Sequence, residues 1–532
     1  MPISLIIRGG TVYDGSGAPG RRADLSIAGD RIAAIGEVPP DVAAPELDAA
    51  GLAVAPGFIN ILSHAWGSLQ AEPRASSDLL QGVTTEVFGE GISPGPATPE
   101  LLAALATSGL EEGQRADFAR LSEGLSYLER GGVAPNVASF VGGHNLRVLG
   151  GGLADGPLGP AALDRMRGVL SEEMTDGALG LGTALIYPPG CFASTDELVA
   201  LSEVVARYDG LYVSHMRSEG DSFMDALDEL LKISRRAGVR AEVYHLKAAG
   251  QQNWPKMTTA IERIEAARGA GQAVGANMYP YIAGGTSLAS AIPPAYHVGG
   301  PDALAARLAD PQERARIARD IRRPSGDWEN LYLAAGGGDG IMLTAGARPS
   351  PDLDGRRLGD VAAERGQDHV DALLDVVRAD PGMSAMYFMA SEENLQLGLR
   401  QPWVSVCSDA EAPAAGPPWT ARPTHPRAYG AFSRFLGRYS RDLGLMPLAE
   451  AIRRMTSLPA GTLRLRDRGT LADGSFADVV VFDPAAITDH ASYSKPHQYA
   501  TGVRHVIVNG QPVVADASIT GALPGRRLRR GA

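Results

Sequence analysis

Apolar positions in the middle of the chain alternate between a helical and an extended period. Ser194 and Glu197 form a predicted capping box, and apolar residues then recur on one helical face until Gly210, where the helix is expected to end. The following apolar run, 211–215, has the length of a strand, and the order of helix and strand is repeated up to residue 245. This regular alternation is typical of β/α units with a parallel sheet.

The same pattern extends over most of the chain. Between residues 57 and 410, nine apolar runs of strand length can be counted, one more than an eight-stranded barrel needs. We therefore predict a TIM-like (β/α)8 barrel over residues 57–466, with one of the runs lying outside it. A long tract at about residues 288–380 is rich in Gly, Pro, Arg and Asp, and we expect it to be an insertion over the barrel mouth.

Both ends of the chain have a different pattern of apolar and polar residues. Short alternating runs such as "SLIIRGGTVYDG" and "ADVVVFDP" are separated by turn signals that include Asp-Gly, Gly-Gly and Gly-Asp. We predict that residues 1–56 and 467–532 fold together as a small composite β-sandwich domain beside the barrel.

Composition narrows the classes of function. Hydrophobic residues make up 44% of the chain and charged residues 21%, as in an ordinary globular protein. A net charge of −12 disfavours nucleic acid as a partner, because binding phosphates needs clustered Lys and Arg. Without a signal-peptide pattern or an apolar run of membrane length, we predict a cytoplasmic protein with no membrane partner. Cys191 and Cys407 cannot form a disulfide framework, which fits a reducing compartment.

Potential metal ligands or bases stand at the ends of several predicted strands. They are His64, Glu90, His144, His215, His245 and Asp409. Active sites of (β/α)8 barrels lie at the carboxyl ends of the strands. A single histidine there has many other roles, but His215 and His245 end consecutive strands, and together they are predicted metal ligands.

These residue types indicate hydrolysis. Zinc accepts histidine nitrogen and carboxylate oxygen, and a catalytic site keeps one position open for water. The metal makes that water a nucleophile near neutral pH and can also polarise a carbonyl group. A carboxylate such as Asp409 can take the proton of the water and deliver it to a leaving amine. The pattern therefore predicts hydrolysis of an acyl bond.

Short motifs are spread over nearly the whole chain in a specific order. They are "APGFIN", "QGVTTEVFGEG", "LIYPPG", "LYVSHMRSEGD", "HLKAAG", "YPYIAGGTSL", "FMASEENL", "SDAEAP", "HPRAYGAF", "MTSLPA", "GSFADVVVFDP" and "GALPGRRL". Together they resemble the N-acyl-D-amino-acid deacylase (D-aminoacylase) family of the amidohydrolase superfamily. The resemblance implies the barrel, a small β-domain, an inserted lid, and zinc-dependent deacylation of a small N-acyl-D-amino acid or a related amide.

The resemblance also implies roles for residues outside the metal site. Asp409 matches the catalytic aspartate of the family, while Lys247, Tyr281 and Ser287 match positions that hold the substrate carboxylate and frame the reacting centre. A lysine ammonium with hydroxyl donors is a suitable carboxylate receptor, because charge-assisted hydrogen bonds are strong. The alternative for Lys247 is a surface lysine whose apolar stem packs on the protein. For Tyr281 and Ser287 the alternatives are packing in the barrel and a turn.

The metal site departs from the family pattern. His215 and His245 match the two histidines of the tightly bound zinc, but Leu62 replaces the first of two histidines on the first strand and only His64 is kept. In place of the family's zinc-binding cysteine, "GEGIS" offers Glu90, which can act as an oxygen ligand. We therefore predict one tightly bound zinc ion, held by Glu90, His215 and His245, and no well-supported second site.

Two residues keep more than one interpretation, and a third departs from the family pattern. His64 is a candidate metal ligand, but it could also bind substrate, orient Asp409 or simply line the pocket. His144 is either a substrate-binding residue or a hydrogen-bonded histidine at a strand end. Asn277 stands where the family commonly has Asp.

The main alternative function is a cyclic-amide hydrolase of the hydantoinase or dihydropyrimidinase type. Those enzymes typically use a carboxylated lysine that bridges two metals, and no lysine ends the fourth predicted strand. A further alternative is a catalytically degenerate scaffold, which the retention of His215, His245 and Asp409 disfavours. The exact substrate, its stereochemistry and acyl group, and any homo-oligomer are left open by the sequence.

Overall fold

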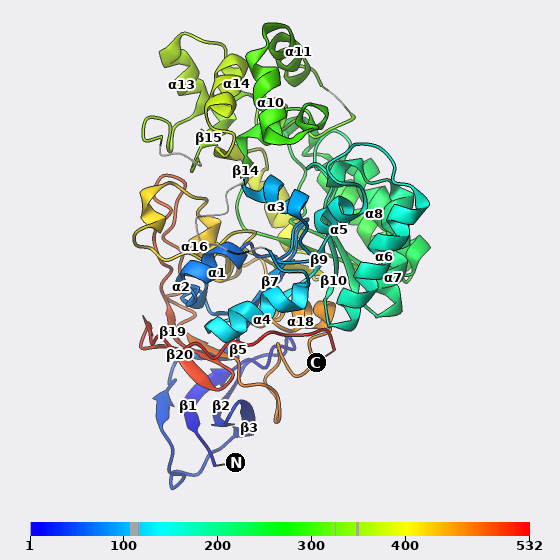
Figure 1. The fold of residues 1–532 in the computed structure, drawn as a ribbon. Coiled ribbons are helices and arrows are strands. Elements are labelled where there is room, and N and C mark those ends of the chain that lie inside the picture. Colours follow the sequence, from blue (N-terminus) through cyan, green and yellow to red (C-terminus); the bar gives the residue numbers. More distant parts are fainter. Residues whose placement is uncertain (1, 107–114, 116, 325, 347–349, 532) are drawn as a thin grey trace.

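A barrel of parallel strands forms the centre of the fold (Figure 1). The computed structural model describes residues 2–106, 115, 117–324, 326–346 and 350–531. The barrel strands are β6 (Phe58–Asn60), β7 (Val83–Phe88), β8 (Asn136–Ser139), β9 (Val141–Gly142), β10 (Gly180–Ala184), β11 (Leu211–His215), β12 (Arg240–Val243), β13 (Val274–Met278) and β17 (Val404–Val406). Because β8 and β9 are consecutive parts of one strand, the described residues give the eight strands of a (β/α)8 barrel.

Backbone hydrogen bonds close this barrel. The Phe140 N–H, between β8 and β9, donates to the Phe88 carbonyl at 2.9 Å and joins the third strand of the barrel to the second. The Asp409 N–H, after β17, donates to the Leu62 carbonyl at 2.9 Å and joins the last strand to the first. The ninth predicted run is β16 (Ser384–Phe388), which pairs with β14 and β15 outside the barrel.

Helices cover the outside of the barrel. They include α4 (Leu121–Gly131), α6 (Pro160–Thr175), α7 (Thr195–Arg207), α8 (Phe223–Ala237), α9 (Lys256–Gly269), α15 (Glu392–Leu399), α16 (Arg427–Arg434) and α17 (Leu448–Met455). The others are α1 (Trp66–Ala71), α2 (Ser76–Leu79), α3 (Pro99–Ala106), α5 (Gly143–Gly151) and α18 (Ser457–Leu463). Ser194 is confirmed as the residue that caps α7, because its hydroxyl accepts a hydrogen bond from the Glu197 N–H at 3.1 Å. The Glu197 carboxylate pairs with Arg147 at 2.6 Å.

A nine-stranded sheet combines both ends of the chain. Its strands are β1 (Leu5–Val12), β2 (Arg21–Ala28), β3 (Arg31–Gly36), β4 (Glu46–Asp48), β5 (Ala53–Pro56), β18 (Val479–Phe482), β19 (Val503–Val508), β20 (Gln511–Ala515) and β21 (Ser518–Ile519). The two ends meet where β5 pairs antiparallel with β18, with Ala55 opposite Val480. A separate core that includes Leu25, Val54 and Ile507 stabilises this small β-domain.

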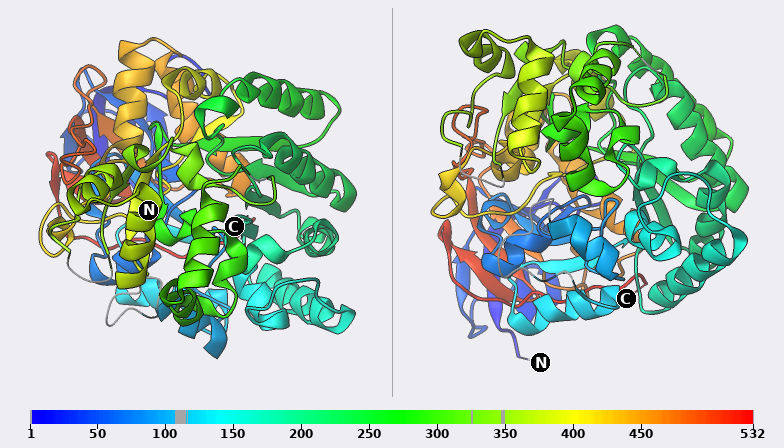
Figure 2. Two further views of the ribbon diagram at one scale, coloured as in Figure 1. Left: turned by 90° about the horizontal axis from the view of Figure 1, so that it is seen from above. Right: turned by 45° about the horizontal axis from the view of Figure 1, so that its top comes forward.

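An inserted segment stands over the carboxyl ends of the barrel strands. It contains β14 (Ala283–Ser287), α10 (Gly300–Ala309), α11 (Pro311–Ile321), α12 (Leu331–Ala334), β15 (Ile341–Leu343), α13 (Leu358–Arg365), α14 (His369–Ala379) and β16. Its helices, green to yellow-green, occupy the top of Figure 1 and lie in front of the barrel when viewed from above (Figure 2, left). The segment has its own hydrophobic core. Residues 325 and 347–349 of the predicted insertion lie outside the described residues.

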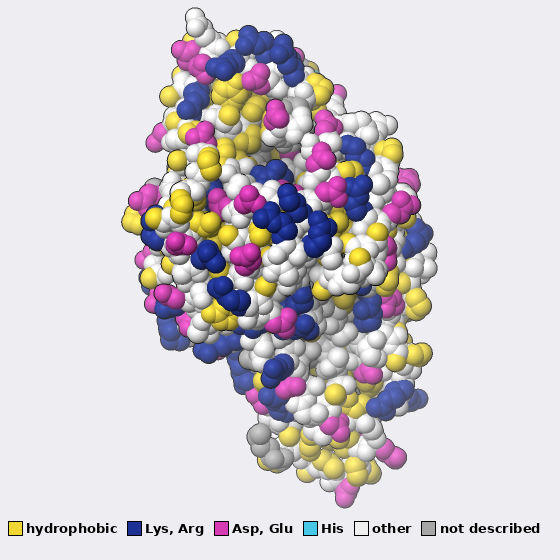
Figure 3. Space-filling view, turned by 90° about the vertical axis from the view of Figure 1, so that its right-hand side faces the viewer, with side chains coloured by type: hydrophobic (Ala, Val, Ile, Leu, Met, Phe, Trp, Pro, Cys, Tyr) yellow, Lys and Arg dark blue, Asp and Glu magenta, His cyan; other side chains and the backbone are white. Residues whose placement is uncertain are grey.

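The surface carries both signs of charge. Figure 3 shows Lys and Arg side chains next to Asp and Glu over most of one face. Within the described ranges, no helix has the length and apolar character needed to cross a membrane. Cys191 and the buried Cys407 are free thiols.

Candidate active site

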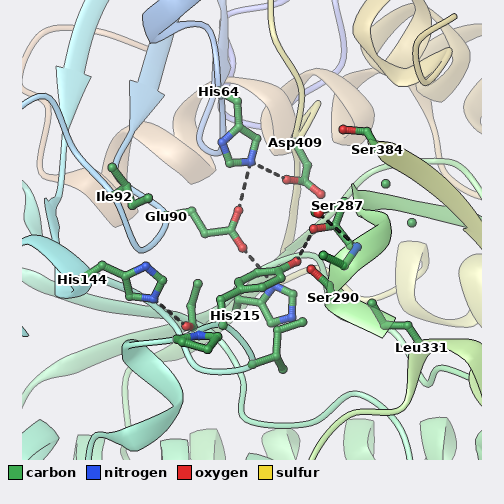
Figure 4. Close-up of a pocket in the computed structure, with 18 of the residues that line it drawn as sticks. His64, Glu90, Ile92, His144, His215, Ser287, Ser290, Leu331, Ser384 and Asp409 are labelled. Carbon is green, nitrogen blue, oxygen red and sulfur yellow. Dashed lines mark hydrogen bonds and ion pairs between the residues drawn. The ribbon is translucent and has the colours of Figure 1, made fainter. Parts of the chain in front are cut away.

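A cavity of about 660 Å³ lies between the barrel loops and the inserted segment. All but one of the candidate residues from the sequence line it; these are His64, Glu90, His144, His215, His245, Lys247, Ser287 and Asp409. Figure 4 shows His64, Glu90 and Asp409 pointing toward one another in this cavity. The fold thus brings together side chains that are more than 300 positions apart in the chain, as His64 and Asp409 are.

Two glycines aim Glu90 into the cavity. Gly89 and Gly91, directly after β7, have φ angles of 108° and 68°, which L side chains rarely adopt. A Cβ atom at Gly91 would also lie 2.9 Å from the Cβ atom of Ala184. The "GEG" motif therefore makes a tight turn that holds the carboxylate inside the barrel mouth.

Two other site residues have an unusual backbone. His245, after β12, has a φ angle of 34°, and Asp409, after β17, has a φ angle of 51°. Left-handed conformations of non-glycine residues cluster at functional sites, where the surrounding structure holds them. Asn277 is part of that support at His245, because its Oδ1 atom accepts a hydrogen bond from the His245 N–H at 2.8 Å.

The first candidate metal group is formed by Glu90, His215 and His245. The Oε1 atom of Glu90 lies 3.0 Å from Nδ1 of His215 and 3.0 Å from Nε2 of His245. All three side chains are largely buried. Two imidazoles and one carboxylate, with room in the cavity for water, are a donor set that fits catalytic zinc.

A second group shares Glu90 with the first. The Nε2 atom of His64 lies 3.1 Å from Oε2 of Glu90 and 3.0 Å from Oδ1 of Asp409. The other carboxylate oxygen of Asp409 accepts a hydrogen bond from Nη1 of Arg427 at 2.6 Å. Asp409 is therefore paired on both oxygens, and Glu90 connects the two groups.

Neighbouring charges keep these carboxylates ionised. Burial by itself raises the pKa of Asp409, but Arg427, then His245 and the contact with His64, lower it below its usual value. Burial likewise opposes ionisation of Glu90, and the three histidines hold its pKa well below the ordinary range. The site is therefore built to keep anionic oxygens available.

Glu219 is a site residue that the sequence interpretation missed. Its Oε1 atom lies 2.9 Å from Nδ1 of His245 and accepts a hydrogen bond from Nζ of Lys247 at 2.7 Å. Against the effect of burial, Lys247 and the histidines lower the pKa of Glu219 to about 2. The residue orients His245 and neutralises Lys247. A signal was present, because Glu219 follows His215 by four residues in "HMRSE".

The remaining predicted residues differ in their placement. Nε2 of His144 lies 3.0 Å from the Ala184 carbonyl, and burial lowers the pKa of the imidazole. The Ser287 hydroxyl accepts a hydrogen bond from the Ala289 N–H at 3.2 Å at the edge of the inserted segment. Both line the cavity.

Tyr281 lies outside the large cavity. Its hydroxyl group lies 3.4 Å from the Pro426 carbonyl, and its ring packs edge-on against His425. Tyr279, two residues earlier, lines the cavity instead, with Arg427 4.7 Å from its ring centroid. The Tyr281 N–H donates a hydrogen bond to the Tyr279 carbonyl at 3.0 Å, so the chain turns sharply at Pro280 and the two tyrosines are placed differently. The predicted role of Tyr281 in substrate binding stays a prediction.

Known proteins resemble this chain over its whole length. It is 37% identical over 540 residues to D-aminoacylase of Alcaligenes xylosoxydans xylosoxydans. This alignment covers 100% of this chain and 99% of that protein. The chain belongs to the D-aminoacylase family. N-acyl-D-glutamate deacylase and N-acyl-D-aspartate deacylase of the same organism are 36% and 34% identical, and each covers at least 99% of the chain. A model of the amidohydrolase family also matches residues 417–514.

Solved structures show the same relationship. An N-acyl-D-glutamate deacylase from Bordetella bronchiseptica, in complex with zinc and a phosphonate mimic of the tetrahedral intermediate, matches with a TM-score of 0.83, 33% identity and 99% coverage of this chain. A D-aminoacylase with a binuclear metal centre matches with a TM-score of 0.82 and 34% identity. A dihydropyrimidinase from Brevibacillus agri, at 15% identity and a TM-score of 0.57, shares the fold. These matches agree with the predicted barrel and family.

Proposed function

We propose that this member of the D-aminoacylase family hydrolyses N-acyl-D-amino acids to a carboxylate and a free D-amino acid. The observation that carries the proposal is the convergence of Glu90, His215 and His245 beside Asp409 in one cavity. The family relationship supports the substrate class. The hydantoinase alternative has only a distant likeness of fold in its favour, and β10, the fourth barrel strand, reads "GLGTA" without a lysine.

We propose that one zinc ion is held tightly by Glu90, His215 and His245. When bound, it polarises the acyl carbonyl and makes a water molecule acidic enough to act as a nucleophile. The group of His64, Glu90 and Asp409 is a weaker candidate, because Asp409 is already paired with Arg427 at 2.6 Å. In this proposal His64 orients Asp409.

Asp409 is proposed as the general base and acid. Its carboxylate takes a proton from the attacking water and delivers it to the nitrogen of the leaving D-amino acid. His64 and Arg427 contact one oxygen each and fix the orientation of the carboxylate. Arg427 also favours the ionised form, which a base requires.

Lys247 and Ser287 are proposed to hold the α-carboxylate of the substrate. Lys247 donates one N–H to Glu219 and lies 2.8 Å from Nδ1 of His245, so at least one of its three N–H groups remains for a substrate carboxylate. The Ser287 hydroxyl lines the same cavity and can donate a second hydrogen bond. Such a bound carboxylate places the adjacent amide over the candidate metal group.

A substrate screen tests the function. The zinc-supplemented protein should release amino acid from N-acetyl-D-amino acids and leave the L-enantiomers and hydantoins intact. Hydrolysis of hydantoins in preference to every linear amide would contradict the proposal. A cytoplasmic location and a homo-oligomer stay predictions.

A further inference from the structure

Two site residues with a left-handed backbone are each held by a buried asparagine. His245 and Asp409 have φ angles of 34° and 51°, and such conformations persist only where the surrounding structure fixes them. The side chains that reach these two positions are Asn277, on β13, and Asn60, on β6. Both asparagines are 0% exposed, and neither is among the described residues that line the cavity. They therefore act on the site from below and not through contact with a ligand.

Asn60 holds the turn that carries Asp409. Its Oδ1 atom accepts a hydrogen bond from the Ser408 N–H at 3.0 Å, and its Nδ2 atom donates one to the Ser408 hydroxyl at 2.7 Å. The next N–H, that of Asp409, donates to the Leu62 carbonyl at 2.9 Å. The segment that begins with β6 thus fixes two successive N–H groups at the proposed base.

Asn277 holds His245 in the same manner. Its Oδ1 atom accepts a hydrogen bond from the His245 N–H at 2.8 Å. Its backbone carbonyl accepts one from the next N–H, that of Leu246, at 2.9 Å. Two successive N–H groups are again fixed, here at a candidate metal ligand.

A buried glutamate on a neighbouring strand fixes each asparagine amide. Nδ2 of Asn60 donates to Oε2 of Glu86, on β7, and Nδ2 of Asn277 donates to Oε1 of Glu242, on β12, both at 2.9 Å. A glutamate carboxyl group can accept this bond whether or not it is protonated. A reversed amide would place its NH₂ group against a backbone N–H, so each amide has one orientation, with its oxygen directed to the site.

Resting on the proposed function, we infer that Asn60 and Asn277 are positioning residues with separate tasks. Asn60 places the carboxylate of Asp409 for proton transfer, and Asn277 places the imidazole of His245 for zinc. A displacement of about 1 Å can cost about 100-fold in rate, because proton transfer needs close alignment. Loss of a group that orients a metal ligand typically weakens metal binding by about 10- to 100-fold.

Alanine variants of the two asparagines separate these tasks. Asn277→Ala should raise the dissociation constant of zinc, measured by competition with a chelator, by about 10- to 100-fold. Asn60→Ala should leave that constant little changed, because it contacts none of the three proposed zinc ligands. At saturating zinc, Asn60→Ala should lower kcat for an N-acetyl-D-amino acid by about 10- to 100-fold with KM little changed, because Asp409 acts in the transition state.

Asn136→Ala is the matched control. Asn136 is also 0% exposed on a barrel strand, β8, but its side chain bonds to Asp478 and Asn509 of the small β-domain, at 3.1 and 2.8 Å. Its loss should lower the free energy of unfolding and leave zinc affinity and kcat unchanged. If all three alanine variants behave alike, the effects come from lost stability and the inference is overturned.

Asn60→Asp and Asn277→Asp test the hydrogen bond itself and do not depend on whether the alanine variants fold. Aspartate keeps the acceptor for the backbone N–H, and a proton shared with the neighbouring glutamate replaces the amide donor. We expect zinc affinity and kcat close to those of the wild type. Folded aspartate variants with a 10-fold or greater loss in either quantity would overturn the inference. An inactive wild type would instead contradict the proposed function, while the zinc affinity of the Asn277 variants would still test the inference.

Discussion

His64 and Glu90 face each other across the barrel mouth, with Nε2 3.1 Å from Oε2. The other oxygen of Glu90 lies 3.0 Å from both His215 and His245. One carboxylate thus connects two groups of potential ligands, although it follows the second barrel strand and the histidines follow the first, fifth and sixth. A single glutamate between two glycines is therefore the central residue of the site.

Metal content should distinguish the two groups. His215→Ala removes one of two imidazoles from the group of Glu90, His215 and His245, and we expect the purified variant to lose its zinc. His64→Ala should keep about one zinc per chain, because the three ligands of the first group remain. Elemental analysis after dialysis measures both. Loss of the tightly bound ion in His64→Ala, with His215→Ala still loaded, would reverse the assignment.

Removing the proposed base should separate metal binding from turnover. Asp409→Asn keeps the size of the side chain but cannot accept the proton, so kcat should fall by about 10²- to 10⁴-fold while zinc stays bound. Steady-state kinetics and metal analysis on the same preparation test this. A variant with wild-type kcat would exclude Asp409 from proton transfer.

Arg427 should control the acidic side of the pH profile. The guanidinium lowers the pKa of Asp409, and Arg427→Gln therefore raises it. Because the base must be ionised, the fall of kcat/KM on acidification should begin at a higher pH in the variant than in the wild type. Arg453→Gln is the control, since Arg453 pairs with Glu450 on α17, away from the cavity. Identical profiles for wild type and Arg427→Gln would contradict the proposed coupling.

Glu242 should make stability depend on pH. Its carboxyl group is buried inside the barrel, where burial raises its pKa to about 7, and it accepts a hydrogen bond from Asn277 at 2.9 Å. Below about pH 4.3 the carboxyl group is protonated in both the folded and the unfolded protein, so its titration does not change the free energy of unfolding. Between that pH and 7 the unfolded chain releases the proton and the folded chain keeps it, so the free energy of unfolding decreases by about 3 kcal/mol.

Glu242→Gln tests this, because glutamine keeps the acceptor and has no proton to lose. Relative to wild type, the variant should gain about 3 kcal/mol in the free energy of unfolding between pH 4 and pH 8. Urea unfolding at both pH values measures it. Glu203→Gln, exposed on α7, is the control and should track the wild type. A constant difference between Glu242→Gln and wild type at the two pH values would show that folding does not raise the pKa of Glu242.

Local sequence patterns were sufficient to predict many of the helices and strands and the family of the protein. The period of apolar residues predicted α7, and Ser194 was correctly expected to begin it, because a capping side chain acts over three residues. The motifs indicated the family and its barrel, which the full-length relatives confirm. Counting apolar runs could not decide which of the nine predicted strands lies outside the barrel. The reason is that β16 and the barrel strands have similar apolar residues and differ only in the strands with which they pair.

The site shows the same division. Strand-end positions marked His215, His245 and Asp409, since the residue that ends a parallel strand is recognisable in the sequence. Glu219 and Arg427 were missed, because their importance lies in pairs with Lys247 and Asp409 that form only after the loops fold back over the barrel. Lys247 was expected as a receptor for carboxylate, and the structure adds that it is already paired.

What the sequence by itself determined is the order of strands and helices, the family and the residue types available for metal binding and proton transfer. Those properties depend on local periodicity and on motifs a few residues long. Only the tertiary structure decided that Glu90 connects two groups of candidate metal ligands, that Tyr279 rather than Tyr281 lines the cavity, and that Glu329 reaches the cavity from the inserted segment. Distances between side chains far apart in the chain depend on packing and loop geometry, which no short stretch of sequence contains.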